Sequence, residues 1–221
     1  MAANLPSNVH VSQHPSLQAK ISQLRSKSTS PRETNALVHE ISLIVACEAL
    51  SKSLTAVPGP QDQTPIGADY ATTNVSPSSL CIVPILRSGL AMVDAVQTML
   101  PQLVPVHHLG MYRELSTLDP VEYYNNLQAG AAAELAILVD PIIATGGTCA
   151  AAIQTLREWG AKRVLVLSIM GAAGGVKQVA EEWPEGTELW IAGVDAELTK
   201  EGMVKPGLGD VGDRLFLTMG K

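Results

Sequence analysis

The residues with the strongest chemical character lie between Asp140 and Thr148. An apolar run over 135–139 ends at Asp140, and the chain then passes through Thr-Gly-Gly-Thr at 145–148 into an alanine-rich stretch. Glycines leave room for a ligand at the backbone, and free N–H groups at a helix start favour an anion. The carboxylate of Asp140 can accept hydrogen bonds from sugar hydroxyls or act through a magnesium-bound water. The segment therefore predicts a phosphate site, and the alternative is a plain turn with a glycine helix cap.

Other polar side chains offer less. His107 and His108 alternate in a predicted strand, so only one can face a given site, and neither is paired with a nucleophile or a metal set. The three cysteines, Cys47, Cys81 and Cys149, are widely separated and lack metal-type spacing. They favour a reducing compartment, and we expect a cytoplasmic protein.

The composition excludes several classes of function. The 221 residues are 46% hydrophobic and 16% charged, which is typical of a globular domain. A net charge of −6 and the lack of a basic run argue against nucleic-acid binding. No segment reaches the roughly 18 apolar residues of a membrane span, and no secretory signal is apparent. We expect small-molecule substrates, with no nucleic acid and no membrane.

The elements that must position these residues follow an α/β pattern. Residues 1–29 are rich in Ser, Gln and Asn and are predicted to form an N-terminal tail or arm, with the domain proper over 30–221. Ser30, Pro31 and Glu33 predict a capped helix that continues to about Leu54. A long loop is predicted over 57–79. Buried parallel strands are predicted at 80–86, 104–109, 135–139, 164–170 and 189–194, with helices at 89–100, 148–159 and 175–183. The segment 113–130 is predicted to be a flap or β-arm.

Four motifs in this order resemble those of the uracil branch of the phosphoribosyltransferase family. They are Val83-Pro-Ile-Leu-Arg-Ser-Gly89, Gly110-Met-Tyr-Arg-Glu114, Val139-Asp-Pro-Ile-Ile-Ala-Thr-Gly-Gly147 and Pro206-Gly-Leu-Gly-Asp-Val-Gly-Asp213. The resemblance runs from roughly residue 10 to the end. It implies the type I phosphoribosyltransferase fold, which is a mainly parallel central sheet flanked by helices, with a C-terminal hood. It also implies transfer of the phosphoribosyl group of 5-phosphoribosyl 1-pyrophosphate to uracil, giving UMP and pyrophosphate.

The resemblance assigns roles to particular positions. Arg87 and Arg113 would contact the pyrophosphate, as arginine forks can. A structural arginine at a helix start and a solvated loop charge are their alternatives. The catalytic set would be Arg113, Asp140 and Asp210. The phosphoribosyl pyrophosphate would also be held by Pro141, Ile142, Ile143, Ala144, Thr145, Gly146, Gly147 and Thr148, and uracil by Met203, Val204, Gly209, Asp210 and Val211.

A second glycine-rich segment lies near the end of the sequence. Gly207-Leu-Gly-Asp-Val-Gly212 matches the dinucleotide-binding pattern G-x-G-x-x-G, but the remaining residues leave no room for the required helix and strand. A loop whose amide and carbonyl groups read the edge of a pyrimidine fits better, and a plain turn is the alternative. The family's usual Gly-Tyr-Ile is Gly202-Met-Val here, and its usual Phe-Gly-Thr is Phe216-Leu-Thr.

The resemblance also implies partners. Mg²⁺ would arrive with the pyrophosphate, because Pro141 follows Asp140 where many relatives outside this branch carry a second acid, so we expect no metal ligands from the protein. A homodimer or homotetramer is expected, and GTP binding is a further expectation from the family. Because Met203 and Leu217 depart from the family pattern, action on another pyrimidine or in uracil catabolism stays open. So does a non-catalytic nucleotide sensor.

Overall fold

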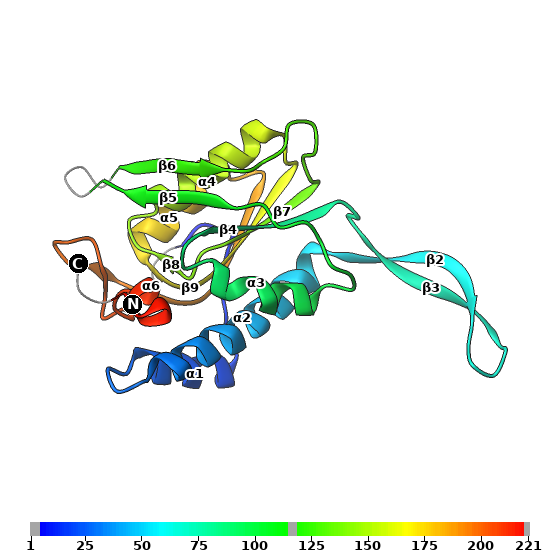
Figure 1. Cartoon of the computed structure of the whole chain (residues 1–221), viewed down its shortest axis with the longest axis horizontal. Helices are drawn as coiled ribbons and strands as arrows, with labels where there is room; N and C mark the ends of the chain where they lie inside the picture. Colours follow the sequence, from blue (N-terminus) through cyan, green and yellow to red (C-terminus); the bar gives the residue numbers. More distant parts are fainter. Residues whose placement is uncertain (1–4, 115–118, 219–221) are drawn as a thin grey trace.

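The middle of the sheet consists of two parallel strands that are almost fully buried, β4 (Leu80–Leu86) and β7 (Leu135–Val139). They belong to a computed structural model that describes residues 5–114 and 119–218, apart from the side chain of Arg113. Figure 1 shows helices on both faces of this sheet. The other elements are β1 (Val9–Val11), α1 (Pro15–Arg25), α2 (Pro31–Ser53), β2 (Thr55–Gln63), β3 (Asp69–Ser76), α3 (Leu90–Met99), β5 (Leu109–Arg113), β6 (Pro120–Asn125), β8 (Ile142–Ile143), α4 (Gly147–Trp159), β9 (Arg163–Ala172), α5 (Ala173–Glu182), β10 (Thr187–Asp195), β11 (Glu197–Leu198), β12 (Val204–Lys205) and α6 (Val211–Phe216).

The strands of the main sheet follow the order β1-β10-β9-β7-β4-β5-β6, with β8 paired to β9. Every pairing in this sheet is parallel except that of β5 with β6. Parallel strands need a crossover between them, and α3 and α4 provide crossovers here. The predicted α/β fold with a mainly parallel sheet is confirmed.

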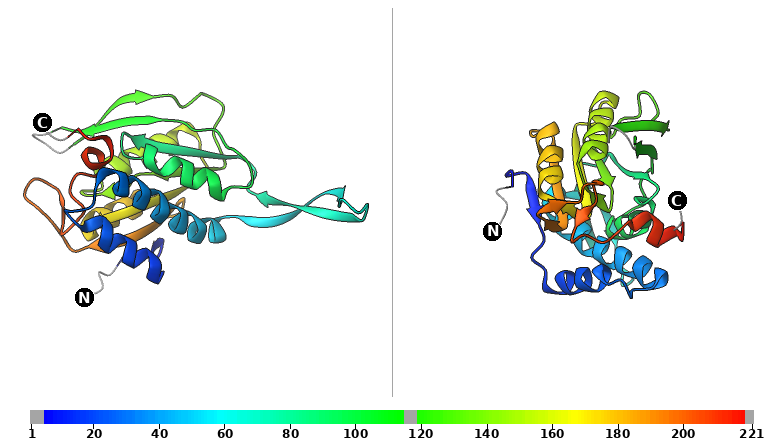
Figure 2. Two further views of the ribbon diagram at one scale, coloured as in Figure 1. Left: turned by 60° about the horizontal axis from the view of Figure 1, so that its bottom comes forward. Right: turned by 90° about the vertical axis from the view of Figure 1, so that its left-hand side faces the viewer.

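Each central strand supplies side chains to two hydrophobic cores. Alternate residues of β4 and β7 face opposite sides of the sheet, because successive strand side chains point in opposite directions. Ile82 and Ile137 pack with α1, α2 and α3, whereas Val83 and Leu138 pack with α4 and α5. The two helical layers lie on opposite sides of the sheet in Figure 2. Strands covered on both faces explain the continuous apolar runs in the sequence.

The structure differs from the prediction of a tail over residues 1–29. Strand β1 pairs in parallel with β10, and α1 packs against α2 and β10. The buried side chains of α1 are Leu17, Ile21 and Leu24, which are at most 4% exposed. Their spacing of three and four residues places them on one helical face. Because the residues between them are polar, the sequence indicated a tail and not this amphipathic helix. The helix belongs to the domain.

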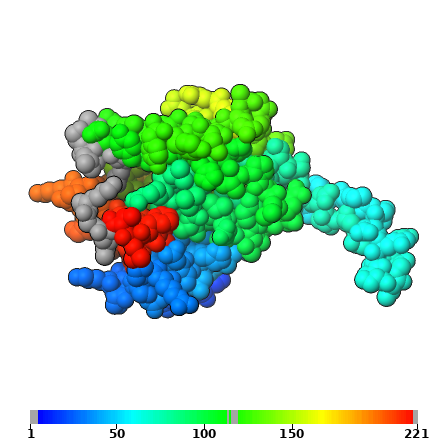
Figure 3. Space-filling model, viewed as in Figure 1, coloured from blue at the N-terminus to red at the C-terminus, as the bar shows by residue number. Residues whose placement is uncertain are grey.

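Two other segments also differ from the sequence predictions. The loop predicted over 57–79 forms the antiparallel hairpin of β2 and β3, which we call the β2–β3 arm, and it extends away from the rest of the molecule (Figure 3). The strand predicted over 104–109 begins only at Leu109, preceded by an isolated bridge between Val106 and Ile82. The flap predicted over 113–130 contains β6, which pairs with β5, while residues 115–118 lie outside the described ranges.

Candidate functional site

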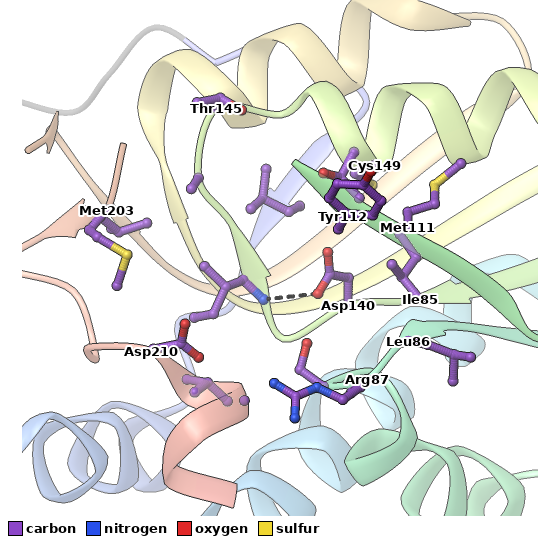
Figure 4. Close-up of a pocket in the computed structure, with 18 of the residues that line it drawn as sticks. Ile85, Leu86, Arg87, Met111, Tyr112, Asp140, Thr145, Cys149, Met203 and Asp210 are labelled. Atoms are coloured by element: carbon purple, nitrogen blue, oxygen red, sulfur yellow. Dashed lines mark hydrogen bonds between the residues drawn. The ribbon is translucent and has the colours of Figure 1, made fainter. Parts of the chain in front are cut away.

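A cavity of about 550 Å³ opens at the carboxyl ends of β4 and β7. Ligand sites in open α/β sheets commonly lie at this edge. Figure 4 shows residues from the middle and from the C-terminal part of the chain around the cavity, including Arg87, Asp140, Thr145, Met203 and Asp210. Segments that are far apart in the sequence therefore form a single site.

The 140–148 turn provides one wall of the cavity. Its lining residues are Asp140, Ile142, Ile143, Ala144, Thr145, Gly146 and Thr148. The side chain of Asp140 is 8% exposed, and its Oδ1 accepts a long hydrogen bond of 3.5 Å from the Ile142 amide. Pro141, which was predicted to contact the phosphoribosyl pyrophosphate, does not line the cavity. Its carbonyl accepts hydrogen bonds from the Ile169 and Met170 amides and so links the turn to β9.

Helix α4 begins directly at this turn. Gly146 caps the helix with a φ of 93°, a left-handed conformation that favours glycine. The first turn of α4 carries no acidic side chain, so the positive end of its dipole is not offset there. Gly147 is not among the lining residues, and an added Cβ would have no neighbour closer than the 3.7 Å contact with Pro120. A helix start of this kind has backbone N–H groups that can bind an anion.

Close packing fixes the shape of this turn. A Cβ on Gly146 would lie 2.5 Å from the Gly175 carbonyl oxygen. A Cβ on Gly175 would lie 2.1 Å from the Ala144 carbonyl oxygen. Helix α5 can support the turn from below only because both positions are glycine. Gly175 was predicted only as the start of a helix, and not as a residue that shapes the site.

The charge of Asp140 influences the neighbouring thiol. Cys149 is 2% exposed and lines the cavity from the first turn of α4. Burial, followed by the negative charge of Asp140, raises the pKa of Cys149 well above its usual value. Cys149 therefore stays a neutral thiol and serves as apolar packing beside the carboxylate.

Arg87 lies between β4 and α3 and faces the C-terminal helix α6. Its Nη2 is 3.8 Å from Oδ1 of Asp213, and its guanidinium carbon lies 5.9 Å from the centre of the Phe216 ring. The side chain is 54% exposed, so the ion pair contributes little to stability. Arg87 lines the cavity and is free to exchange Asp213 for a more highly charged anion.

The 203–211 segment provides the opposite wall. The residues predicted to hold uracil all line the cavity: Met203, Val204, Gly209, Asp210 and Val211. Asp210 also caps α6, since its Oδ1 accepts a 3.0 Å hydrogen bond from the Asp213 amide. The six-residue α6 that follows is too short for a dinucleotide-binding helix. Leu217 caps the end of α6 and is 70% exposed, outside the lining residues.

Two tyrosines that line the cavity were not among the predicted site residues. Tyr112 and Tyr123 line the cavity from β5 and β6, with ring centres 6.2 Å apart. Tyr112 lies within the Gly110-Met-Tyr-Arg-Glu114 motif, and Tyr123 lies in the predicted flap, so the sequence held an indication of each residue.

Arg113 ends β5, and its side chain lies outside the described part of the structure. His107 and His108 do not line the cavity, and His107 packs against Trp159.

The cavity offers few metal ligands. Over residues 5–114 and 119–218, no group of three or more His, Cys, Asp or Glu side chains could hold a metal ion. Asp140 and Asp210 come from different walls. This donor set fits a cation that brings most of its ligands with it, such as Mg²⁺ on a pyrophosphate. In the same described ranges, no helix has the length and apolar character to cross a bilayer.

Comparison with solved structures identifies the class of protein. The adenine phosphoribosyltransferase of Trypanosoma brucei matches with a TM-score of 0.54 and 17% identity, covering 86% of this chain and 84% of that one. The AQ2163 protein of Aquifex aeolicus matches with a TM-score of 0.86 and 28% identity, covering 95% and 98%. The fold is that of a type I phosphoribosyltransferase.

Sequence comparison identifies the family. The sequence model of the family "Uracil phosphoribosyltransferase" matches residues 11–218. The uracil phosphoribosyltransferase of Lysinibacillus sphaericus is 40% identical, over 96% of this chain and 99% of that protein. The enzyme of the same name from Listeria innocua is 38% identical, with the same coverage. The chain belongs to the uracil phosphoribosyltransferase family.

Proposed function

We propose that this protein transfers the 5-phosphoribosyl group of phosphoribosyl pyrophosphate to uracil, giving UMP and pyrophosphate. One observation carries the proposal. The 140–148 turn and the 203–211 segment face each other across a single cavity, so a sugar phosphate and a base can meet there. Family membership supports the choice of substrates.

Each wall would hold one part of the reacting pair. The 5-phosphate would bind the N–H groups at the start of α4, and Asp140 would accept hydrogen bonds from the ribose hydroxyls. Arg87 would leave Asp213 and contact the pyrophosphate. Uracil would lie against Met203, with backbone groups of residues 209–211 at its edge. Asp210 would approach the phosphoribosyl group from the same wall.

The reaction then needs positioning more than covalent chemistry. The bond between C1 of the ribose and the pyrophosphate oxygen breaks with its electron pair on that oxygen. Uracil N1 forms the new bond to C1, and its proton passes to the departing pyrophosphate or to water. Positive charge develops on the ribose ring, so orientation and neutralisation of the leaving group can supply the rate enhancement. Tyr112 and Tyr123 lie where they can exclude water.

Magnesium is proposed to enter with the pyrophosphate. Its charge would stabilise the leaving group, and Asp140 and Asp210, the carboxylates that line the cavity, would contact its waters.

The cellular setting is proposed on separate grounds. A cytoplasmic location is supported by three free cysteines. A homodimer or homotetramer is supported by the β2–β3 arm, because an isolated two-stranded hairpin is only marginally stable without a surface to pack on. GTP as a regulator is supported by the family resemblance alone.

The test is direct. Purified protein with Mg²⁺, phosphoribosyl pyrophosphate and labelled uracil should form labelled UMP. Asp140→Asn and Arg113→Ala should each lower kcat by about 100-fold or more while leaving the fold intact. Asp94→Asn, on the surface of α3, is the matched control and should behave as the parent. Binding of phosphoribosyl pyrophosphate without UMP formation would refute the proposal and favour a sensor. Full activity in both site variants would refute the residue assignments.

A further inference from the structure

The predicted tail and the 203–211 segment are joined by a partly buried ion pair. Arg25, the last residue of α1, donates from Nη2 to Oδ1 of Asp195 at 2.7 Å and from Nη1 to Oδ2 at 2.8 Å. Asp195 ends β10 and is 9% exposed. A two-pronged contact of this kind fixes both the distance and the angle between its partners. Helix α1 is therefore rigidly attached to the end of β10.

The same pair holds one residue of the 203–211 segment by both of its backbone groups. The Gly207 amide donates to Oδ2 of Asp195 at 2.9 Å, and the Gly207 carbonyl accepts from Nη1 of Arg25 at 2.8 Å. Gly207 has a φ of 62°, and an added Cβ would lie 2.0 Å from the Val204 carbonyl oxygen. The ion pair thus fixes a tight turn in the middle of the wall that lines the cavity.

A second arginine makes the reciprocal connection. Arg214 of α6 donates from Nη1 to the Leu24 carbonyl at 2.7 Å and to the Leu208 carbonyl at 2.8 Å. Its Nη2 donates to the Ser26 carbonyl at 3.3 Å. Carbonyls at a helix C-terminus lack partners within the helix, and Arg214 supplies one for α1. The two arginines link the end of α1 to Gly207 and Leu208.

The charge state of Asp195 agrees with this arrangement. Burial raises the pKa of this carboxyl, but the hydrogen bonds from Arg25 and from the Gly207 amide outweigh burial, and the pKa is lowered overall. The carboxylate is therefore ionised at neutral pH. Its two oxygens are engaged by Arg25 and Gly207 and are not available to substrate.

We propose that Arg25 and Asp195 are positioning residues for uracil. Through Gly207 they hold the backbone on which the base rests, while the 140–148 turn makes no hydrogen bond to either of them among those described. The proposal rests on the proposed function and adds that the N-terminal helix α1 is part of the base subsite. It predicts that loss of the pair affects uracil and leaves phosphoribosyl pyrophosphate nearly unaffected.

Steady-state kinetics tests the proposal. Arg25→Ala and Asp195→Asn should each raise the KM for uracil by about tenfold or more, as expected for lost charged hydrogen bonds, with little change in the KM for phosphoribosyl pyrophosphate. Because the two residues form one unit, the double variant should be no worse than the more impaired single variant. Arg25→Lys keeps the positive charge but loses the two-pronged guanidinium contact. Its KM for uracil should therefore lie between that of the parent and that of Arg25→Ala. Lys20→Ala removes an ion pair to Glu40 from the same helix and should match the parent.

A measurement independent of turnover separates this proposal from the proposed function. In hydrogen exchange, Arg25→Ala should speed exchange over residues 203–211 and leave 140–148 unchanged. If the parent forms no UMP, the proposed function fails, and the exchange result still decides whether the pair holds the segment. Equal rises in both KM values, or unchanged exchange over 203–211, would overturn the positioning role. If Arg25→Ala does not fold, the kinetic and hydrogen-exchange measurements are made on Arg25→Lys instead.

Discussion

Gly146 and Gly175 lie against each other with no space for a side chain at either position, since a Cβ on Gly146 would be 2.5 Å from the Gly175 carbonyl oxygen. The contact joins the cap of α4 to the first turn of α5. The shape of the 140–148 turn therefore depends on a residue that is some thirty positions away in the sequence and does not line the cavity.

Gly175→Ala should displace the 140–148 turn. The new Cβ would lie 2.1 Å from the Ala144 carbonyl, and overpacking of this kind costs about 1–3 kcal/mol. We expect a loss of affinity for phosphoribosyl pyrophosphate of about tenfold or more, measured by calorimetry. Gly174→Ala is the matched control, because a Cβ there would have no neighbour within 4 Å. Equal behaviour of the two variants would contradict the role of Gly175.

Met203→Tyr should strengthen uracil binding. Met203 lines the cavity on the base side, and an aromatic ring can stack on the base with a gain of about 1 kcal/mol. We expect the KM for uracil to fall severalfold and the KM for phosphoribosyl pyrophosphate to stay near that of the parent. Unchanged uracil affinity would mean that this position does not control recognition of the base.

Leu217→Gly should stabilise the protein. Leu217 has a φ of 55°, a left-handed conformation that is costly for leucine, and its exposed side chain gives little packing in return. Glycine at a helix C-cap removes this strain, and we expect a gain of about 0.5–1 kcal/mol in the free energy of unfolding. Leu103→Gly, at an exposed position without positive φ, should instead destabilise because it adds freedom to the unfolded chain. Urea unfolding distinguishes the two.

Acid should weaken the anchoring of the 203–211 segment. Since the pKa of Asp195 is lowered in the folded state, its carboxylate stabilises the protein above its unfolded pKa of about 3.9, and this stabilisation is lost as pH falls through the folded value. The parent should be more stable than Asp195→Asn at pH 7 by about 1–3 kcal/mol, and the difference should shrink in acid. If the difference in the free energy of unfolding between the parent and Asp195→Asn stays constant from pH 7 to about pH 3, this account is wrong.

The three thiols should differ in reactivity. Cys47 is exposed, whereas burial raises the pKa of Cys81 to about 12, and burial followed by the charge of Asp140 raises the pKa of Cys149 well above its usual value. Because the thiolate is the reactive form, a maleimide at neutral pH should label Cys47 at least about 100-fold faster than the other two. Mass spectrometry after short exposure checks this, and Cys47→Ser should abolish the fast phase. Rapid labelling of Cys149 would show that the wall of the cavity opens.

Much of the site could be predicted because local sequence determines it. The apolar runs at 80–86 and 135–139 are strands with those bounds, and Asp140 follows the second one directly. The 140–148 turn combines a strand end, glycines and a helix start within nine consecutive positions, so its chemistry is visible without the fold. The capping box of Ser30 and Glu33 is local in the same way and is present in the structure.

The missed features depend on distant contacts. Strands β2 and β3 are largely exposed on both faces and pair mainly with each other, so they lack the apolar alternation that marks a strand, and Pro58, Gly59 and Pro60 suggested a loop. Helix α1 was not predicted because its buried face consists of only three residues, Leu17, Ile21 and Leu24. The contacts of Arg25 with Asp195 and Gly207 span 170 and 182 positions, and no local pattern can show them.

The separation between Arg25 and Gly207 also affects the order in which the protein can be assembled during translation. Arg25 leaves the ribosome early, whereas Asp195 and Gly207 emerge after the strands that form the phosphate side of the cavity. A growing chain can therefore complete the 140–148 turn while the base side is still unformed. The contacts of Arg25 and Asp195 with Gly207 can form only after Gly207 has been synthesised, so the base side of the cavity is completed after the phosphate side.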